Sequence, residues 1–565
     1  MYAEWNISDT APAETITQLS QELALPEVMA RILYNRGVET REDATYFFNA
    51  GIEKLHDPYL MADMETAVEC VLDAIRNKKK ILIYGDYDVD GATSTSMLYL
   101  FFKQLGFFAD FYIPNRVRDG YGLNVEQMQI AHEKGVDLII TVDCGITAIE
   151  EVAHAKQLGM DVIVCDHHQP GPEMPAANAI LNPKRADCPF PFKELAGVGV
   201  AFKLAQGIMQ SLGQSLEDFK GLLELVAIGS AADIVPLVGE NRILVKAGLE
   251  QLNQTENVGL QALMRKTGLL GKKIGTGQII FMLAPRINAV GRMGDAMRAV
   301  RLLVAKDFYE AASVASVLEK ENQQRRNLDE KTFREAVSII EKEYDPETSA
   351  AFVLASDKWH PGVIGIAASR LVEKYYRPTV MIAIDNGVGK GSARSISGFN
   401  IYEAMESCED LMVAYGGHKY AAGMSINSEN IDAFRQRINA YASDLLTEEL
   451  LTKTLNIEGE IKLVDITERF KNMLKHLAPF GPQNLRPTFV SKNVEIVGMP
   501  AIVGKNHLRF KVRQDDVSFD AIGFNLGGMM HRVRASDGNL SIAYVIDENT
   551  WQGRTTTQLR IKDIQ

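Results

Sequence analysis

Three short, uninterrupted apolar segments constrain the fold of this chain more than any other feature. They occupy residues 81–84, 138–142 and 162–165, and each is followed by a polar turn and then by a stretch of helical character. Continuous apolar runs of this length are typical of strands buried on both faces of a parallel sheet. The sequence therefore predicts an α/β domain built from βαβ crossovers.

Length and composition predict several domains. The 565 residues are 46% hydrophobic and 24% charged, which supplies several buried cores and argues against disorder. A polar helical stretch, a second α/β pattern and a final region of short alternating segments follow the first domain, and the last pattern favours a small β-barrel. We expect an N-terminal helical segment (1–80), a parallel-sheet catalytic domain (81–300), a connecting helix (301–345), a smaller α/β domain (346–446) and a C-terminal barrel (455–565).

Cysteine usage and hydropathy indicate a cytoplasmic protein. The five cysteines contain no C-x-x-C pair, so we expect free thiols in a reducing compartment. No window approaches 18 uninterrupted apolar residues, and the N-terminus lacks the basic start and apolar core of a signal peptide. We therefore expect no membrane contact.

The overall charge argues weakly against a polyanion partner, but its distribution does not. The net charge is -13, whereas residues 451–565 contain 16 basic and 12 acidic residues. A mildly basic C-terminal region on an acidic body permits contact with nucleic acid without requiring it.

Acidic residues and histidines follow each of the three apolar runs. The first run leads into Asp86, Asp88 and Asp90, the second into Asp143, and the third into the segment 166–168, Asp-His-His. Because the carboxyl ends of parallel strands meet at one edge, where open α/β sheets bind ligands, these side chains should converge. Solvated turns, a calcium-loop fragment and histidine caps are the alternatives for each cluster alone, although no helix precedes the Asp-x-Asp-x-Asp segment as an EF-hand requires.

Converging carboxylates predict a divalent metal site. Such carboxylates repel one another, and a bound cation removes the repulsion. Carboxylate and imidazole ligands without thiolate suit Mn²⁺, Mg²⁺, Fe²⁺ or Zn²⁺, and this many carboxylates could hold two ions about 4 Å apart, as phosphoryl-transfer enzymes do.

Five segments together resemble the motifs of the DHH phosphoesterase superfamily, and the fifth resembles its RecJ branch in particular. They are residues 84–91, 141–145, 166–168, 232–237 and 284–292. The resemblance extends over nearly the whole chain. It implies a DHH catalytic domain, an accessory DHHA1 domain and a C-terminal OB-fold.

The resemblance also implies the roles of individual residues. It implies two Mn²⁺ or Mg²⁺ ions per active site, with Asp143 bridging them and His168 near the scissile phosphate. Within the first acidic trio we favour Asp88 and Asp90 as direct ligands, and the direct role of each member stays open. The implied metal ligands are Asp86, Asp88, Asp90, Asp143, His167 and Asp233, and the implied catalytic residues are Asp88, Asp143, His167, His168 and Asp233.

Substrate contacts are expected at three places. Glycines let backbone N–H groups approach an anion and arginine can bind phosphate bidentately, so the segments 391–395 and 416–418 suit a phosphate clamp, with a Gly-rich hairpin as the alternative. The barrel's basic residues, with Phe510 between them, suit single-strand binding, although a solvated strand face would look the same. The candidate contacts are Arg116, Arg118, Tyr121, Arg286, Asn288, Arg292, Ser392, Arg394, Gly417 and His418, and on the OB-fold Lys505, Arg509 and Lys511.

The resemblance implies a metal-dependent 5′→3′ exonuclease on single-stranded DNA, acting in recombination and repair. The expected partners are single-stranded DNA, a single-strand-binding protein and a RecQ-type helicase. Two alternatives are a phosphodiesterase for short oligoribonucleotides or cyclic dinucleotides and a non-catalytic single-strand-binding protein.

Overall fold

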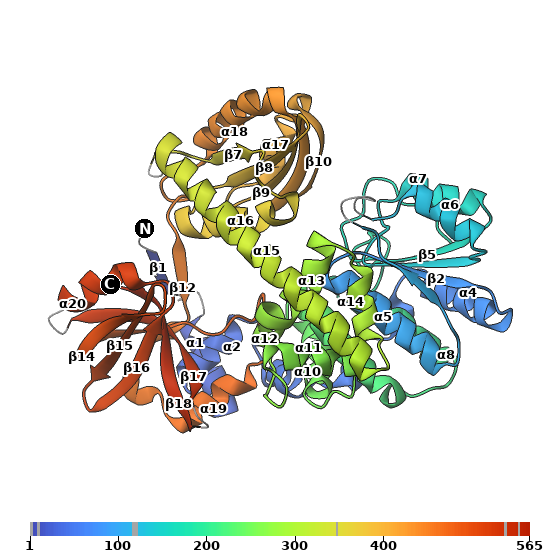
Figure 1. The fold of residues 1–565 in the computed structure, drawn as a ribbon. Coiled ribbons are helices and arrows are strands. Elements are labelled where there is room, and N and C mark those ends of the chain that lie inside the picture. Colours follow the sequence, from blue (N-terminus) through green and yellow to red (C-terminus); the bar gives the residue numbers. More distant parts are fainter. Residues whose placement is uncertain (1–3, 8–11, 116–121, 346–347, 536–538, 552–553) are drawn as a thin grey trace.

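The structure is a computed structural model that describes residues 4–7, 12–115, 122–345, 348–535, 539–551 and 554–565. Figure 1 shows a parallel sheet, a second mixed sheet and a barrel at three corners of the molecule, joined by helices. None of the described helices combines the length and apolar character needed to cross a bilayer.

The first domain contains the predicted parallel sheet. Its order is β3-β2-β4-β5-β6, and every neighbouring pair is parallel. Alternate residues of the central strands enter two different cores, one on each face, which explains why the strand sequences are apolar throughout. The strands are β2 (Ile81–Gly85), β3 (Asp110–Tyr112), β4 (Leu138–Val142), β5 (Asp161–Cys165) and β6 (Ala179–Leu181).

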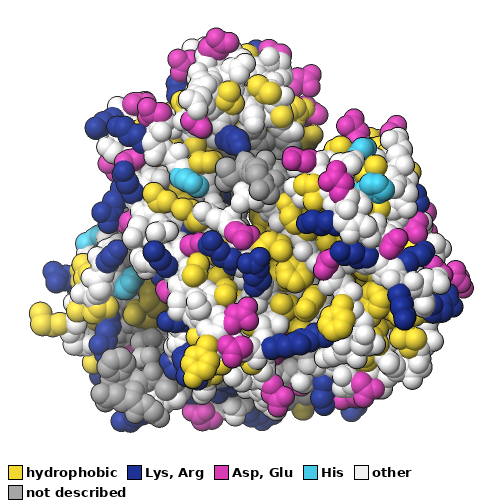
Figure 2. Space-filling model, turned by 45° about the vertical axis from the view of Figure 1, so that its right-hand side comes forward, with side chains coloured by type: hydrophobic (Ala, Val, Ile, Leu, Met, Phe, Trp, Pro, Cys, Tyr) yellow, Lys and Arg dark blue, Asp and Glu magenta, His cyan; other side chains and the backbone are white. Residues whose placement is uncertain are grey.

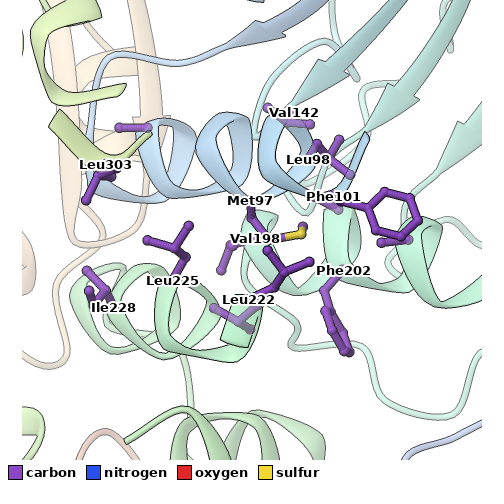
Figure 3. Packing of buried hydrophobic residues seen from close by; sticks show 14 of the residues in the cluster. Met97, Leu98, Phe101, Val142, Val198, Phe202, Leu222, Leu225, Ile228 and Leu303 are labelled. Carbon is purple, nitrogen blue, oxygen red and sulfur yellow. The ribbon is translucent and has the colours of Figure 1, made fainter. Parts of the chain in front are cut away.

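Helices cover both faces of this sheet and extend it into a helical half. Figure 3 shows Met97 and Phe101 of α5 packed near Val198 and Phe202 of α8 and near Leu225 of α9. One face is covered by α4 (Met64–Arg76), α5 (Val89–Gln104) and α8 (Gly197–Ser211), and the other by α6 (Val125–Glu133) and α7 (Ile149–Gln157). The helical half comprises α9 (Leu223–Ala232), α10 (Gly239–Leu252), α11 (Val258–Thr267), α12 (Thr276–Gln278), a π-helical turn (Ile279–Leu283), α13 (Ala284–Met293) and α14 (Met297–Leu303).

A single long helix connects this body to the second α/β domain (Figure 1). Helix α15 (Phe308–Glu343) has 36 residues, about 54 Å at 1.5 Å per residue. The second sheet has the order β10-β11-β9-β8-β7, and only β7 and β8 are parallel. Its elements are β7 (Phe352–Ser356), α16 (Pro361–Tyr375), β8 (Thr379–Asp385), β9 (Val388–Arg394), α17 (Ile401–Glu406), β10 (Met412–His418), β11 (Ala421–Asn427) and α18 (Ile431–Leu445).

The C-terminal region forms a closed barrel. The order β14-β15-β16-β18-β17 closes because β17 also pairs with β14. This confirms the barrel predicted from short alternating segments. The elements are β12 (Thr454–Ile457), β13 (Gly459–Glu460), α19 (Glu468–His476), β14 (Phe489–Val503), β15 (His507–Gln514), β16 (Val517–Gly523), α20 (Met530–Ala535), β17 (Leu540–Trp551) and β18 (Arg554–Ile564).

The N-terminal residues pack in two places. Strand β1 (Glu4–Ile7) pairs with β12, and helices α1 (Ala13–Leu23), α2 (Glu27–Tyr34) and α3 (Arg41–Asn49) share one hydrophobic core with the barrel. Helix α4, in contrast, belongs to the core of the first domain. Arg242 of α10 links the two bodies, because its guanidinium donates to the carbonyls of Phe47 (3.1 Å) and Leu477 (2.8 Å).

Candidate active site

The ends of three parallel strands place the predicted acidic residues at one edge of the sheet. Gly85, Val142 and Cys165 are the last residues of β2, β4 and β5, and the register pairs them side by side. The residues that follow them, Asp86, Asp143 and Asp166, are therefore neighbours. Asp143 has a φ of +61°, a conformation rare for residues other than glycine, and such strain is characteristic of functional sites.

His167 lies at the centre of the carboxylates. Its Nε2 atom lies 3.2 Å from Asp143 Oδ1, 3.6 Å from Asp233 Oδ2 and 3.9 Å from Asp90 Oδ2. Asp86, Asp88 and Asp143 form a second compact group of oxygen atoms. Asp143 thus belongs to both groups, which is the position expected of a ligand that bridges two ions.

Burial and mutual repulsion shift the pKa values of these groups. Burial, together with the charge of Asp88, raises the pKa of Asp90 to about 7. Burial, followed by the charges of Asp90 and Asp88, raises the pKa values of Asp143 and Asp233 well above the usual range. A cation bound among these carboxylates would oppose both effects.

The chemistry of His167 fits such a cation. Burial and the nearby His168 lower the pKa of His167 to about 3, so its imidazole is neutral. Its Nε2 is buried and has no hydrogen-bond partner among the described residues, while the surrounding carboxylate oxygens are also acceptors. A divalent ion bound between these acceptors would satisfy all of them, since neutral imidazole and carboxylate are ordinary ligands of divalent ions such as Mn²⁺.

Backbone and side-chain contacts hold the cluster in place. The N-terminus of α8 donates from Gly197 and Val198 to the two oxygens of Asp90, at 2.7 and 2.8 Å. The carboxylate of Asp166 accepts from the backbone N–H groups of His167 and His168 and lies 2.7 Å from Nδ1 of His168. The sequence placed Asp166 at this edge without a separate role, and it did not single out Gly197, because the chain spacing gives no signal that α8 begins beside Asp90.

His168 is electrostatically distinct from His167. Burial disfavours its charged form, but the hydrogen bond to Asp166 and the charges of Asp166, Asp86 and Asp88 outweigh burial and raise its pKa. A protonated imidazole at this edge can attract a phosphate group.

Helix α13, which carries the fifth motif, contacts both the segment after β2 that carries Asp86, Asp88 and Asp90 and the second domain. The side-chain oxygen of Asn288 accepts from the backbone N–H of Val89 at 3.0 Å. At Gly291 a β-carbon would lie 2.3 Å from the carbonyl oxygen of Tyr87, so only glycine allows this approach. Arg292 donates to the carbonyl of Gly362 at 3.3 Å, at the start of α16.

A cationic cavity of about 550 Å³ lies between α13, the start of α16 and the second sheet. Four of the candidate substrate contacts line it, namely Arg292, Ser392, Arg394 and Gly417. No Asp or Glu is among its lining residues in the described part of the chain.

Comparison with known proteins identifies the family. The chain matches the DHH family N-terminal domain over residues 80–230, the DHHA1 domain over 347–444 and the RecJ OB domain over 457–563. It is 39% identical to the single-stranded-DNA-specific exonuclease RecJ of Bacillus subtilis, over 97% of this chain and 69% of that protein. The RecJ of Escherichia coli is 34% identical, over 96% of each chain. This chain belongs to the RecJ family.

Solved structures of RecJ proteins have the same fold. The Mn²⁺ complex of RecJ from Thermus thermophilus superposes with a TM-score of 0.85 at 29% identity, covering 100% of this chain and 79% of that chain. The Mg²⁺ complex of the same protein gives a TM-score of 0.79 at 27% identity, covering 100% and 78%. The predicted DHH, DHHA1 and OB-fold architecture is therefore confirmed.

The remaining candidate contacts of this RecJ-family chain are dispersed. Arg286 forms an ion pair with Glu319 at 2.5 Å, so its guanidinium is already engaged within the protein. His418 ends β10, where burial and the positive charge of His168 lower its pKa. Arg116, Arg118 and Tyr121 lie outside the described residues.

The barrel presents its basic residues on one strand face. Arg509 and Lys511 of β15 are exposed, as is Lys505 in the preceding turn. Phe510 is only 4% exposed and packs in the barrel core, so the expectation that it lies between these basic residues on a strand-binding surface is wrong. Figure 2 shows further Lys and Arg side chains, in dark blue, across the middle of the view and below the accessory domain at the top.

Proposed function

We propose that the chain is a metal-dependent exonuclease that hydrolyses single-stranded DNA from its 5′ end, acting in DNA recombination and repair. The observation that carries this proposal is the neutral, buried His167 surrounded by the oxygens of Asp90, Asp143 and Asp233. The names of the RecJ relatives support the substrate, and the family resemblance supports the direction.

We assign the metal site to Asp86, Asp88, Asp90, Asp143, His167 and Asp233. Two Mn²⁺ or Mg²⁺ ions bound there would lower the pKa of a water molecule and neutralise charge on the scissile phosphate. The chain's own contribution is to hold the carboxylates: α8 fixes Asp90 through two backbone donors, and Asp166 fixes the turn that carries both histidines. His168 supplies positive charge beside the phosphate.

The cationic cavity supports recognition of the strand's end. Arg292, Ser392 and Arg394 line it together with the N-terminus of α16, and both arginine guanidinium groups and helix N-termini bind phosphate. We propose that these residues hold the 5′ phosphate while the next linkage reaches the carboxylate cluster. Lys505, Arg509 and Lys511 would contact the strand farther along by their charge.

We further propose a cytoplasmic location, with a single-strand-binding protein and a RecQ-type helicase as partners, on the strength of the family resemblance. Pull-down of each purified partner with the full chain tests the association. The residues that would dock them are not assigned.

A substrate panel with Mn²⁺ tests the proposed function. Single-stranded DNA labelled at the 5′ or 3′ end, duplex DNA and di- to pentanucleotide RNA are incubated with the protein and with Asp143→Ala. We expect early release of labelled mononucleotide from the 5′-labelled single strand alone, and no product with the variant. Consumption of short RNA with long DNA intact would instead establish an oligoribonucleotide phosphodiesterase, and binding without cleavage a non-catalytic protein.

A further inference from the structure

The cationic cavity is larger than one phosphate group requires. Its volume of about 550 Å³ lies within the range of pockets that enclose whole small ligands. Ser392 and Arg394 occupy only part of its wall. The strand register shows what forms the rest.

Three rows of residues face the cavity across β9, β11 and β10. The strand pairing places Arg394 beside Ala421, Ser392 beside Gly423, and Lys390 beside Ser425. Alternate residues of a strand point to the same face, so Lys390, Ser392 and Arg394 project together. The intervening Ala393, Ala422 and Met424 are buried in the domain core on the opposite face.

The rows have a direction relative to the carboxylate cluster. His418 pairs with Ala421 in the row of Arg394. Gly365 of α16 lies against Ser392 and Arg394, and the start of the same helix contacts Arg292 of α13, so these rows lie toward the first domain. Lys390 lies at the opposite end, two positions beyond Ser392. Residues two apart in a strand are about 7 Å apart, which leaves a separate position for an anion.

Lys390 is available for such an anion. It is exposed, it lines the cavity together with Ser425, and it forms no ion pair with any described residue. The small side chains of Ala414 and Gly423 beside this row leave the space above it open. The cavity thus continues as a second cationic position, farther from the carboxylates than the Ser392–Arg394 position.

We propose that Lys390 and Ser425 form a subsite for a phosphate group attached beyond the 5′ phosphate that Ser392 and Arg394 hold. Such a subsite would let the enzyme accept 5′-triphosphate ends. This inference rests on the proposed function. The same chemistry could come from the terminal phosphates of a triphosphate or from the linkage of one additional nucleotide. The lack of any acidic lining residue among the described residues favours the more highly charged triphosphate.

The reaction at a triphosphate end balances without another reactant. The oxygen of water joins the phosphorus of the first internucleotide linkage, the bond from that phosphorus to the 3′ oxygen breaks, and the 3′ oxygen takes a proton. The first residue leaves as a nucleoside 5′-triphosphate, and the shortened strand keeps a new 5′ monophosphate.

The test compares kcat/KM on otherwise identical single strands that begin with 5′-monophosphate or 5′-triphosphate. We expect the wild-type protein to release nucleoside triphosphate from the second strand, identified by anion-exchange chromatography. Lys390→Ala should lose about tenfold on the triphosphate strand, since hydrogen bonds to charged groups contribute on this scale, and stay within twofold on the monophosphate strand. Lys390→Arg should restore activity, and Lys374→Ala, at the far end of α16, is the matched control.

Other outcomes separate the possibilities. Equal effects of Lys390→Ala on both strands, or no effect on either, would overturn the subsite. A dinucleotide product that the wild type forms and Lys390→Ala does not would assign the subsite to an additional nucleotide. Failure of the wild type on the monophosphate strand would instead refute the proposed function.

Discussion

Asp143 lies where the two groups of candidate ligands meet. Its Oδ1 atom lies 3.2 Å from His167 Nε2, and it also lies within the group formed by Asp86 and Asp88. Asp233 belongs to the His167 group alone. The two residues therefore contribute differently to metal binding.

Metal stoichiometry should distinguish them. In calorimetric titration with Mn²⁺ we expect two bound ions for the wild type and one for Asp233→Asn. For Asp143→Asn we expect that neither ion binds with the wild-type affinity. Exonuclease activity of Asp143→Asn should fall more than about a hundredfold, because changes to groups that merely support metal ligands already cost about 10- to 100-fold. Retention of two tightly bound ions by both variants would contradict this assignment.

Glu224 is a buried acid away from this site, and it makes stability depend on pH. Burial raises the pKa of Glu224 from 4.5 to about 7, despite a hydrogen bond to Thr255. Between these values the folded protein holds a proton that the unfolded chain releases, so stability falls as pH rises through this range. The cost above pH 7 is about 3 kcal/mol.

Glu224→Gln should remove this dependence. We expect the variant to have a higher Tm than the wild type at pH 8, by several degrees, and the advantage to shrink at pH 5. Thermal unfolding at both pH values measures the difference, with the exposed Glu250→Gln as the matched control. An equal advantage at both pH values would show that titration of Glu224 is not its cause.

Among the elements, helix α8 determines the geometry of the cluster. Its first residues donate to Asp90, and Gly197 lies directly against Asp143. A β-carbon at Gly197 would lie 2.7 Å from Asp143 Oδ1, closer than β-carbons normally approach. Gly199, about half a turn later, would meet the Leu195 side chain, whose Cδ2 atom lies 3.2 Å and whose Cβ atom lies 3.4 Å from the added β-carbon.

Two alanine substitutions therefore make a matched pair. Gly197→Ala should displace Asp143 and weaken both Mn²⁺ binding and exonuclease activity more than about tenfold, because second-shell positioning contributes on this scale. Gly199→Ala should leave both within about twofold, since a leucine methyl can move. Circular dichroism checks that both variants fold, and equal activity of the two folded variants would exclude the proposed role of Gly197.

At the scale of the whole molecule, the two ends of the chain form one body. Strand β1 pairs with β12, and α1–α3 bury their apolar faces in the core of the barrel. The parallel sheet and the second sheet have separate cores. Removing the barrel alone should therefore expose apolar surface on the N-terminal helices.

Two truncations test this arrangement. A chain of residues 1–446 should bind a hydrophobic dye and self-associate, whereas residues 51–446, which also lack α1–α3, should remain monomeric and bind Mn²⁺. Size-exclusion chromatography and dye fluorescence compare the two proteins. Equal behaviour of both would mean that the N-terminal helices do not depend on the barrel.

Local pattern by itself determined the parallel sheet and the edge at which Asp86, Asp143 and His167 meet. Strands buried on both faces must be apolar, so the apolar runs locate the strands. Because parallel strands bring their carboxyl ends to one edge, the residues that follow these runs are expected to meet there. Phe510 could also have been placed correctly, because Leu508, Phe510 and Val512 alternate with charged residues, and this alternation marks the inward face of β15.

Only the tertiary structure decided the contacts between distant segments. It placed Gly197 against Asp143, engaged Arg286 with Glu319, paired Lys390 with Ser425, and packed α1–α3 on a barrel more than 400 residues away. These contacts depend on how complete helices and sheets pack, and periodicity within a segment specifies which face is buried but not which partner covers it.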